Sequence, residues 1–208
     1  MYDVKAFDEP RVEVLHALIR AHPLATWVVT TAQGLEANHI PLLIDPEPTP
    51  WGTLLGHVAR ANPVWRTFDR NTDVLAVFQG PQGYITPSGY PSKAQHGKVV
   101  PTWNYAVVHA HGPLIIHDDT EWLRKLVTRL TVSQESRRDK PWQVTDAPPD
   151  YIDTMLKAIV GIEIPIRRLQ GKWKMSQNRL PQDRDGVIQS LQAQNDAASL
   201  AMLDKMRE

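Results

Sequence analysis

The 208-residue chain contains no cysteine, which excludes disulfide bonds, thiolate metal ligands and a cysteine nucleophile. It carries 23 acidic and 23 basic residues, so no net positive charge attracts it to nucleic acid. The overall balance does not exclude a local basic patch. Its apolar runs fall well short of the roughly 20 residues that span a bilayer. The N-terminus lacks the pattern of a secretory signal peptide. We therefore expect a soluble, cytoplasmic protein without a membrane segment.

Several common functional motifs are also missing. The sequence has no GxGxxG, GxxxxGK[ST], HExxH or GxSxG motif, which removes the usual signatures of dinucleotide-binding, P-loop, zinc-protease and hydrolase sites. No pair of helices with a short glycine-containing turn carries a basic recognition face. A helix-turn-helix is therefore not expected.

Hydrophobic residues make up 42% of the chain, which is a globular composition, and short strand-like segments with proline-rich connections dominate it. The β-branched and aromatic patterns predict strands over Ala25–Thr31, Leu35–Asp45, Gly52–Ala59, Asp73–Phe78, Asn104–His117 with a hinge at Gly112-Pro113, and Ile159–Leu169. Helical spacing predicts helices over Glu9–Arg20, Thr120–Val132, Asp150–Lys157, Asp185–Gln194 and Ala197–Met206, and a short helix after Asn62.

The turn Gln33-Gly34 is expected to join the first two strands as a hairpin, with Pro41 at an edge or bulge. Asp118 and Glu121 have the spacing of a capping box before the Thr120–Val132 helix. The segment Gln79–Val100 is rich in glycine and proline and is expected to form a long functional loop, with a short strand at Tyr84–Thr86.

These elements predict a mostly β fold with flanking helices, in the form of a small antiparallel barrel. Short turns rather than helices join the first strands, which argues against a doubly wound parallel sheet. No internal repeat or linker is present. We expect one domain over residues 1–208, with C-terminal helices from about residue 185.

The segment GHVARANP, residues 56–63, has a strand end followed by a helix start. Free N–H groups at a helix N-terminus attract anions, and Arg60 adds a full positive charge beside the capping residue Asn62. Together they could hold a phosphate. The commoner use of such residues is an ordinary capped helix with a solvated arginine.

A second candidate segment is strongly basic. From Arg167 to Arg184 there are six basic residues and one acidic residue, a local charge of 6 − 1 = +5 in a neutral protein. Lys174 and Gln177 lie in its centre. The mixture suits an anionic ligand with polar edges, and a solvated basic face explains it equally well.

Aromatic residues and histidines give further candidates. Trp103 and Asn104 could stack on or rim a planar ring, although packing in the core is the more frequent use of these residue types. His109 and His111 alternate on a strand, but two neutral ligands do not make a metal site, so none is predicted. His39 and His57 are expected either to line a polar pocket or to lie within the barrel with their ring nitrogens hydrogen-bonded.

Taken in order, these segments resemble the PaiB-like family of FMN-binding negative transcriptional regulators. The resemblance spans nearly the whole chain. It rests on MYDVKAF, AHPLATWVVT, ANHIPLLI, GHVARANPVW, VFQGPQGYITPSGYPSK, VPTWNYAVVHAHG, the Trp122–Thr131 helix and KWKMSQNR.

The resemblance implies a flavin-binding split β-barrel, related in fold to pyridoxamine-phosphate oxidases, that forms a homodimer with FMN at the interface. It implies that Arg60 and Asn62 hold the FMN phosphate, and that His39, Ile40 and His57 line the flavin. It further implies that residues of the partner chain cover the ring and ribityl chain: Trp103, Asn104, Lys174 and Gln177.

Two functions follow from this resemblance. The first is an FMN-binding regulator of protease- and sporulation-type genes, with DNA as a weakly supported partner because the charge balance is neutral. The second is a flavin oxidoreductase with a small-molecule substrate. No general acid or base can be named, and the flavin itself carries the electrons, so enzyme status stays open. A dimeric scaffold that has lost its cofactor is a third reading, which GHVARANP and KWKMSQNR disfavour.

Overall fold

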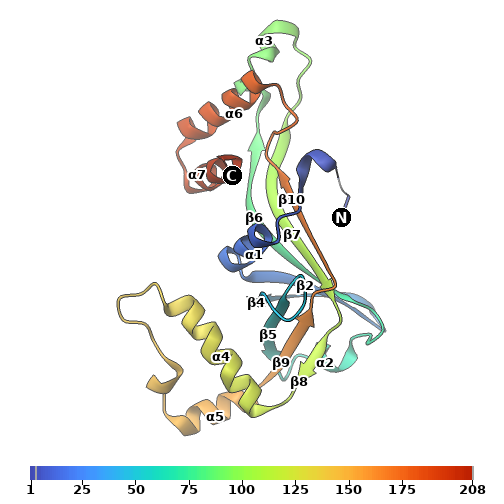
Figure 1. Cartoon of the computed structure of the whole chain (residues 1–208), viewed down its shortest axis with the longest axis vertical. Coiled ribbons are helices and arrows are strands. Elements are labelled where there is room, and N and C mark those ends of the chain that lie inside the picture. Colours follow the sequence, from blue (N-terminus) through green and yellow to red (C-terminus); the bar gives the residue numbers. More distant parts are fainter. Residues whose placement is uncertain (3, 208) are drawn as a thin grey trace. The chain divides into compact units, whose positions relative to one another are not determined.

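The computed structural model of the chain describes residues 1–2 and 4–207 (Figure 1). The chain forms two compact units. The first unit comprises Met1–Ala21, Gln79–His109 and Gln170–Glu208, and the second comprises His22–Phe78 and Ala110–Leu169. Strands β6, β7 and β10 each begin in one unit and end in the other.

The first unit joins a small antiparallel sheet to short helices. Within it the strands follow the order β1-β10-β7-β6. Its elements are η1 (Lys5–Phe7), β1 (Asp8–Glu9), α1 (Val12–Ala21), η2 (Pro87–Gly89), α3 (Ser92–His96), α6 (Pro181–Gln194), α7 (Ala197–Arg207) and parts of β6 (Val74–Ile85), β7 (Thr102–Gly112) and β10 (Arg168–Lys174).

Helix α1 covers this sheet through an apolar face at helical spacing. Leu15, Leu18 and Ile19 are almost fully buried. Glycine in the sheet makes the close approach possible, because a Cβ at Gly171 would lie 2.2 Å from Leu15 Cδ2. The predicted helix at Glu9–Arg20 is confirmed from Val12 onward, whereas Glu9 belongs to β1.

The second unit holds most of the remaining strands, in two sheets. One has the order β6-β2-β3 and the other β4-β5-β9-β8. Its elements are β2 (Leu24–Thr31), β3 (Gly34–Pro41), β4 (Leu43–Asp45), β5 (Thr53–Ala59), α2 (Val64–Thr67), β8 (Ile115–His117), α4 (Thr120–Glu135), η3 (Val144–Asp146), α5 (Pro149–Lys157) and β9 (Ile159–Pro165).

The hairpin β2–β3 confirms the predicted turn. Its register pairs Thr31 with Gly34 and Leu24 with Pro41. Gly34 has a φ of +113°, which suits glycine at the tight turn. Pro41 ends the edge strand β3, as a residue without an N–H donor should. The predicted partner strand is interrupted at Leu42 and resumes as β4.

The most regular helix, α4, is confirmed, but its cap differs from the prediction. The side chain of Asp119 accepts a hydrogen bond from the backbone N–H of Trp122 at 2.7 Å. The predicted capping residue, Asp118, is instead paired with Arg60. Spacing alone placed the cap one residue too early because both positions carry aspartate.

The predicted long loop over Gln79–Val100 is wrong in its first part. Strand β6 continues to Ile85 through two glycines and a proline. Gly80 is present for packing, since a Cβ there would lie 2.8 Å from Leu18 Cδ1 and 3.3 Å from Ala106. The sequence pattern around Gly80 indicated a loop, but the glycine is needed because helix α1 packs closely on the strand. A contact with a distant helix cannot be inferred from local sequence.

The last elements are confirmed with shifted bounds. Helix α6 begins at Pro181, four residues before the predicted start at Asp185, because proline occupies its first turn. The predicted strand Ile159–Leu169 is divided into β9 and the start of β10. None of the described helices is long and apolar enough to cross a membrane.

Candidate functional site

The nine predicted site residues fall into two groups, one in each unit. The His57 cluster belongs to the second unit and comprises His39, Ile40, His57, Arg60 and Asn62. The Trp103 cluster belongs to the first unit and comprises Trp103, Asn104, Lys174 and Gln177.

The His57 cluster joins strand β3 to the end of β5. His39 is exposed and Ile40 is buried, as expected for neighbours on opposite faces of β3. The side-chain amide of Asn62 donates a hydrogen bond to Asn38 Oδ1 at 2.8 Å, which ties the segment after β5 to β3. The structure therefore brings these two predicted segments together.

His57 carries an unsatisfied polar atom. Its Nδ1 is buried and has no hydrogen-bond partner among the described residues. Burial lowers the pKa of its imidazole below 6.5, so the ring is neutral at pH 7. A buried nitrogen without a partner costs stability, and a ligand with a donor or acceptor could satisfy it. This feature fits a polar edge such as that of a flavin.

Arg60 is held mainly by the protein itself. Its Nε donates to the backbone carbonyl of Lys157 at 2.7 Å, and its Nη2 donates to the carbonyl of Ile159 at 3.0 Å. Both Nη atoms also pair with the carboxylate of Asp118, with Nη1 at 3.0 Å. The hydrogen bond from Arg60 lowers the pKa of Asp118. A guanidinium has five N–H donors, and these four donations leave one for a ligand.

The predicted start of helix α2 is one residue too early: Pro63 is the N-cap, Val64 is the first helical residue, and Asn62 lies just before them. Asn62 Oδ1 accepts a hydrogen bond from the backbone N–H of Val64 at 3.0 Å. The helix spans only Val64–Thr67, which is too short for a developed dipole. The predicted phosphate cradle of Arg60 and Asn62 is thus largely filled by protein groups, and a phosphate would compete with Asp118.

Trp103 offers a flat apolar surface on β7. Its side chain is 54% exposed, and its ring meets Tyr84 edge-on with centroids 6.0 Å apart. A cavity of about 380 Å³ opens beside it, lined by Gln79, Gln82, Trp103, Tyr105, Ala106 and Val107. Gln79 and Gln82 were not predicted as site residues, because their glycine- and proline-rich surroundings indicate a loop instead of a strand.

Lys174 lies at the edge of this surface. Its Nζ donates to the carbonyl of Trp103 at 2.8 Å and also to Thr102 Oγ1. Burial, with smaller contributions from Arg179 and Lys172, lowers the pKa of its ammonium group. Lys172 lies near the same surface, 5.9 Å from the centroid of Tyr105. The structure thus brings Lys174 to the backbone of Trp103, while their predicted contact with a ligand stays a prediction.

Asn104 and Gln177 have structural partners instead. Asn104 is fully buried, on the face of β7 opposite Trp103, and exchanges hydrogen bonds with Ser176 Oγ at 3.0 and 3.2 Å. Gln177 accepts from the backbone N–H of Met175 at 2.6 Å and donates to the carbonyl of Trp173. Strand alternation was a usable signal that Trp103 and Asn104 point apart.

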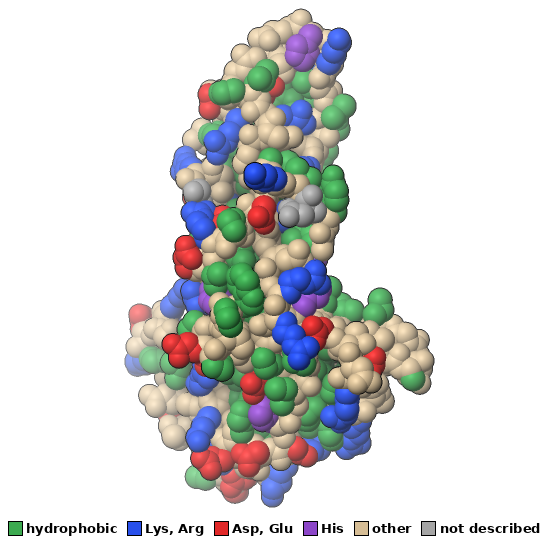
Figure 2. Space-filling model, turned by 45° about the vertical axis from the view of Figure 1, so that its right-hand side comes forward, with side chains coloured by type: hydrophobic (Ala, Val, Ile, Leu, Met, Phe, Trp, Pro, Cys, Tyr) green, Lys and Arg blue, Asp and Glu red, His purple; other side chains and the backbone are tan. Residues whose placement is uncertain are grey.

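The basic segment does not form a single basic face. Arg167 pairs with Asp73 at 3.2 Å in the second unit. In the first unit Lys172 is buried and donates to the carbonyl of Tyr2, and Arg184 donates to the carbonyl of Met206. On the face drawn in Figure 2, basic and acidic side chains are interspersed. The described residues contain no group of three or more potential His, Asp or Glu metal ligands.

Comparison with known sequences gives matches over most or all of the chain. A model of the family described as "Putative FMN-binding domain" matches residues 1–168. An uncharacterised protein of Emericella nidulans is 35% identical, and the match covers 100% of this chain and 97% of that protein. The protease synthase and sporulation protein PAI 2 of Bacillus subtilis is 34% identical over 100% of this chain and 97% of its own length.

Comparison with solved structures identifies the fold. A conserved hypothetical protein of Mycobacterium tuberculosis superimposes with a TM-score of 0.58 at 14% identity, covering 87% of this chain and 94% of that one. The flavocytochrome Anf3 of Azotobacter vinelandii gives a TM-score of 0.56 at 12% identity, covering 80% and 69%. At these identities the likeness concerns architecture, which is that of split β-barrels.

Proposed function

The chain belongs to the PaiB-like family of FMN-binding domains, and we propose that it binds FMN between two copies of itself and acts as a flavin-dependent regulator. The observation that supports this function most strongly is the full-length match to the sporulation protein PAI 2. Its name connects that relative with protease synthesis and sporulation. By analogy, we propose that this chain controls genes for protease synthesis and sporulation.

The Trp103 cluster supplies the surface for the flavin ring. A half-exposed indole beside a cavity of about 380 Å³ suits a planar ring system. Lys174, fixed by the carbonyl of Trp103, places a positive charge at the edge of that surface. Bound FMN would supply electron transfer, and the protein would supply position and charge.

The His57 cluster of the other subunit would complete the site. His57 Nδ1 is buried without a partner, so a polar edge of the ligand could satisfy it. The remaining donor of Arg60 could reach a phosphate oxygen. His39 on β3 and Asn62 after β5 would lie beside the ligand in the same cluster. Asn104 and Gln177 would support the Trp103 surface from behind rather than touch the ligand.

Exposed apolar side chains in the first unit support the dimer. Trp103, Tyr84 and Val100 are 54%, 52% and 63% exposed. Trp103 and Tyr84 meet edge-on, and exposed apolar side chains in contact on a surface commonly mark an interface. A second copy of the chain would cover them and enclose the flavin.

A flavin oxidoreductase is the second candidate function. The charge distribution favours it, because the chain has no net charge and basic and acidic side chains are interspersed on the face in Figure 2. Direct and strong DNA binding needs a basic surface. If no promoter fragment is retarded at low salt, regulation by direct DNA contact is refuted and the oxidoreductase becomes the better description.

Titration with FMN, followed by quenching of flavin fluorescence, tests the proposed site. Loss of one stacking ring costs about 1–3 kcal/mol, so Trp103→Ala should weaken FMN binding by roughly 5- to 150-fold. Trp142→Ala is the matched control, since Trp142 is a comparably exposed tryptophan outside both clusters, at 46%. Equal affinities of both variants would refute the placement. Light scattering should show a dimer, and a monomer with bound flavin would contradict the shared site.

A further inference from the structure

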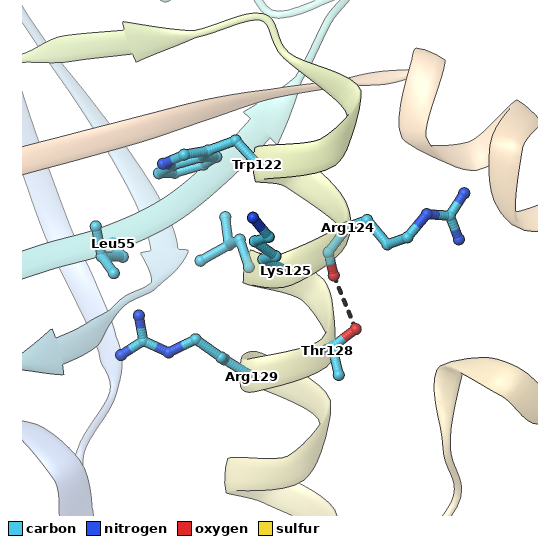
Figure 3. A pocket seen from close by; sticks show the side chains of 7 residues that line it. Leu55, Trp122, Arg124, Lys125, Thr128 and Arg129 are labelled. Atoms are coloured by element: carbon cyan, nitrogen blue, oxygen red, sulfur yellow. Dashed lines mark hydrogen bonds between the residues drawn. The ribbon is translucent and has the colours of Figure 1, made fainter.

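A second cavity lies in the second unit, between helix α4 and strand β5 (Figure 3). Its volume is about 640 Å³, which is within the usual range for small-molecule sites. None of its residues belongs to the His57 or Trp103 cluster. The cavity, here called the Trp122 pocket, is lined by Leu55, Trp122, Arg124, Lys125, Leu126, Thr128 and Arg129.

The indole of Trp122 is held in place before any ligand binds. One face stacks on the imidazole of His117, with centroids 4.0 Å apart and planes 7° apart. His117 Nε2 is in turn 2.6 Å from Glu163 Oε2. The backbone of Gly161 packs directly against the ring, because even a Cβ added there would lie 2.2 Å from Trp122 Cζ3. The indole therefore cannot shift toward β9. A fixed aromatic surface needs little ordering when a ring stacks on it.

The other walls combine apolar and cationic groups. Leu55 and Leu126 are buried and provide an apolar floor. Trp122, Lys125 and Arg129 follow helical spacing, and Figure 3 shows Trp122 and Arg129 extending from α4 toward the side of Leu55. The side chain of Arg124 extends to the opposite side of the helix.

The cations of the pocket are only weakly neutralised. Lys125 pairs with Glu121 at 2.7 Å and Arg129 pairs with Asp45 at 2.9 Å, and both pairs are substantially exposed. Exposed ion pairs contribute little and exchange readily. Lys125 and Arg129 line the pocket and no carboxylate of the described residues does, whereas the charge of Arg124 lies on the opposite side of α4. An anion in the pocket would therefore gain attraction without facing a like charge in its walls.

We propose that the Trp122 pocket binds a small aromatic carboxylate, with its ring against the free face of Trp122 and its carboxylate toward Arg129 and Lys125. A neutral apolar ligand would leave the cations unused. A carboxylate matches the planar guanidinium of Arg129, whose Nε and Nη1 are not used in its pair with Asp45. The volume admits a bicyclic ring system.

The test uses 2-naphthoate as the probe and 2-naphthamide as its neutral analogue. Calorimetric titrations are made on the full chain saturated with FMN. Naphthoate should bind, and naphthamide should bind at least about tenfold more weakly, because a charged hydrogen bond is lost. Equal affinities, or no naphthoate binding at millimolar concentration, would overturn the proposal.

Matched variants locate the interaction. Arg129→Gln should weaken naphthoate binding about tenfold, whereas Arg124→Gln, which removes the same charge from the same helix, should leave it unchanged. Equal losses in the two variants would indicate a general charge effect and refute the site. Circular dichroism verifies that both variants are folded.

The same titrations distinguish this pocket from the proposed flavin site. Naphthoate binding in the FMN-saturated protein should equal that in the FMN-free protein. Displacement of naphthoate by FMN would mean that the Trp122 pocket holds the flavin. That result would overturn the proposal that the pocket is a separate site. Loss of FMN binding in Trp103→Ala should leave naphthoate binding intact.

Discussion

Replacing Gly161 by alanine is expected to destabilise the second unit through Trp122. The added Cβ would lie 2.2 Å from Trp122 Cζ3 and 2.7 Å from Cε3, far inside contact distance. The indole must therefore move, and it loses its stacking on His117, which is worth about 0.5–1.5 kcal/mol. Overpacking of this kind typically costs about 1–3 kcal/mol, so we expect a loss in that range.

Urea unfolding of four proteins measures this effect as a double-mutant cycle: wild type, Gly161→Ala, Trp122→Ala and the double variant. Without the indole, the nearest neighbour of the new methyl group is His117 Cβ, at 3.1 Å. The cost of Gly161→Ala should then fall to within about 0.5 kcal/mol of zero. An equal cost with and without the tryptophan would refute the reasoning, because the penalty would then arise from the strand itself.

Two other predictions concern polar pairs. Arg60 lowers the pKa of Asp118 below 3.8, so their pair stabilises the fold above that pH and loses its contribution as the pH falls through the lowered pKa. The unfolding free energies of wild type and Asp118→Asn should differ by at most about 1 kcal/mol at pH 7, because the pair is exposed. The two values should converge as the pH falls through the lowered pKa of Asp118, and a constant difference would contradict this. Asn104→Ala leaves the hydroxyl of Ser176 buried and unpaired, so urea unfolding should show a loss of about 1–3 kcal/mol, and an unchanged midpoint would disprove the buried pair.

The elements set by local patterns could be predicted from the sequence. The turn at Gln33-Gly34 and the apolar stripe of α4 depend on residues a few positions apart. The extension of β6 through Gly80 could not be predicted, because the reason for that glycine is the distant Leu18. Local propensity is overridden where tertiary packing decides.

The candidate site was predictable to a similar degree. The family resemblance brought Lys174 together with Trp103, which the structure places in contact. It did not reveal that Arg60 is held by Asp118, since 58 residues separate them and neither position signals the other. Asn104 was assigned to the ligand although alternation along β7 turns it away from Trp103.

The most direct test of the central claim is the absorbance spectrum of the protein after incubation with FMN and removal of free flavin by gel filtration. We expect a flavin spectrum that elutes with the protein, at one FMN per subunit or per shared site of a dimer. A protein fraction without flavin absorbance, at every FMN concentration used, would contradict FMN binding by this chain and the regulatory function proposed from it.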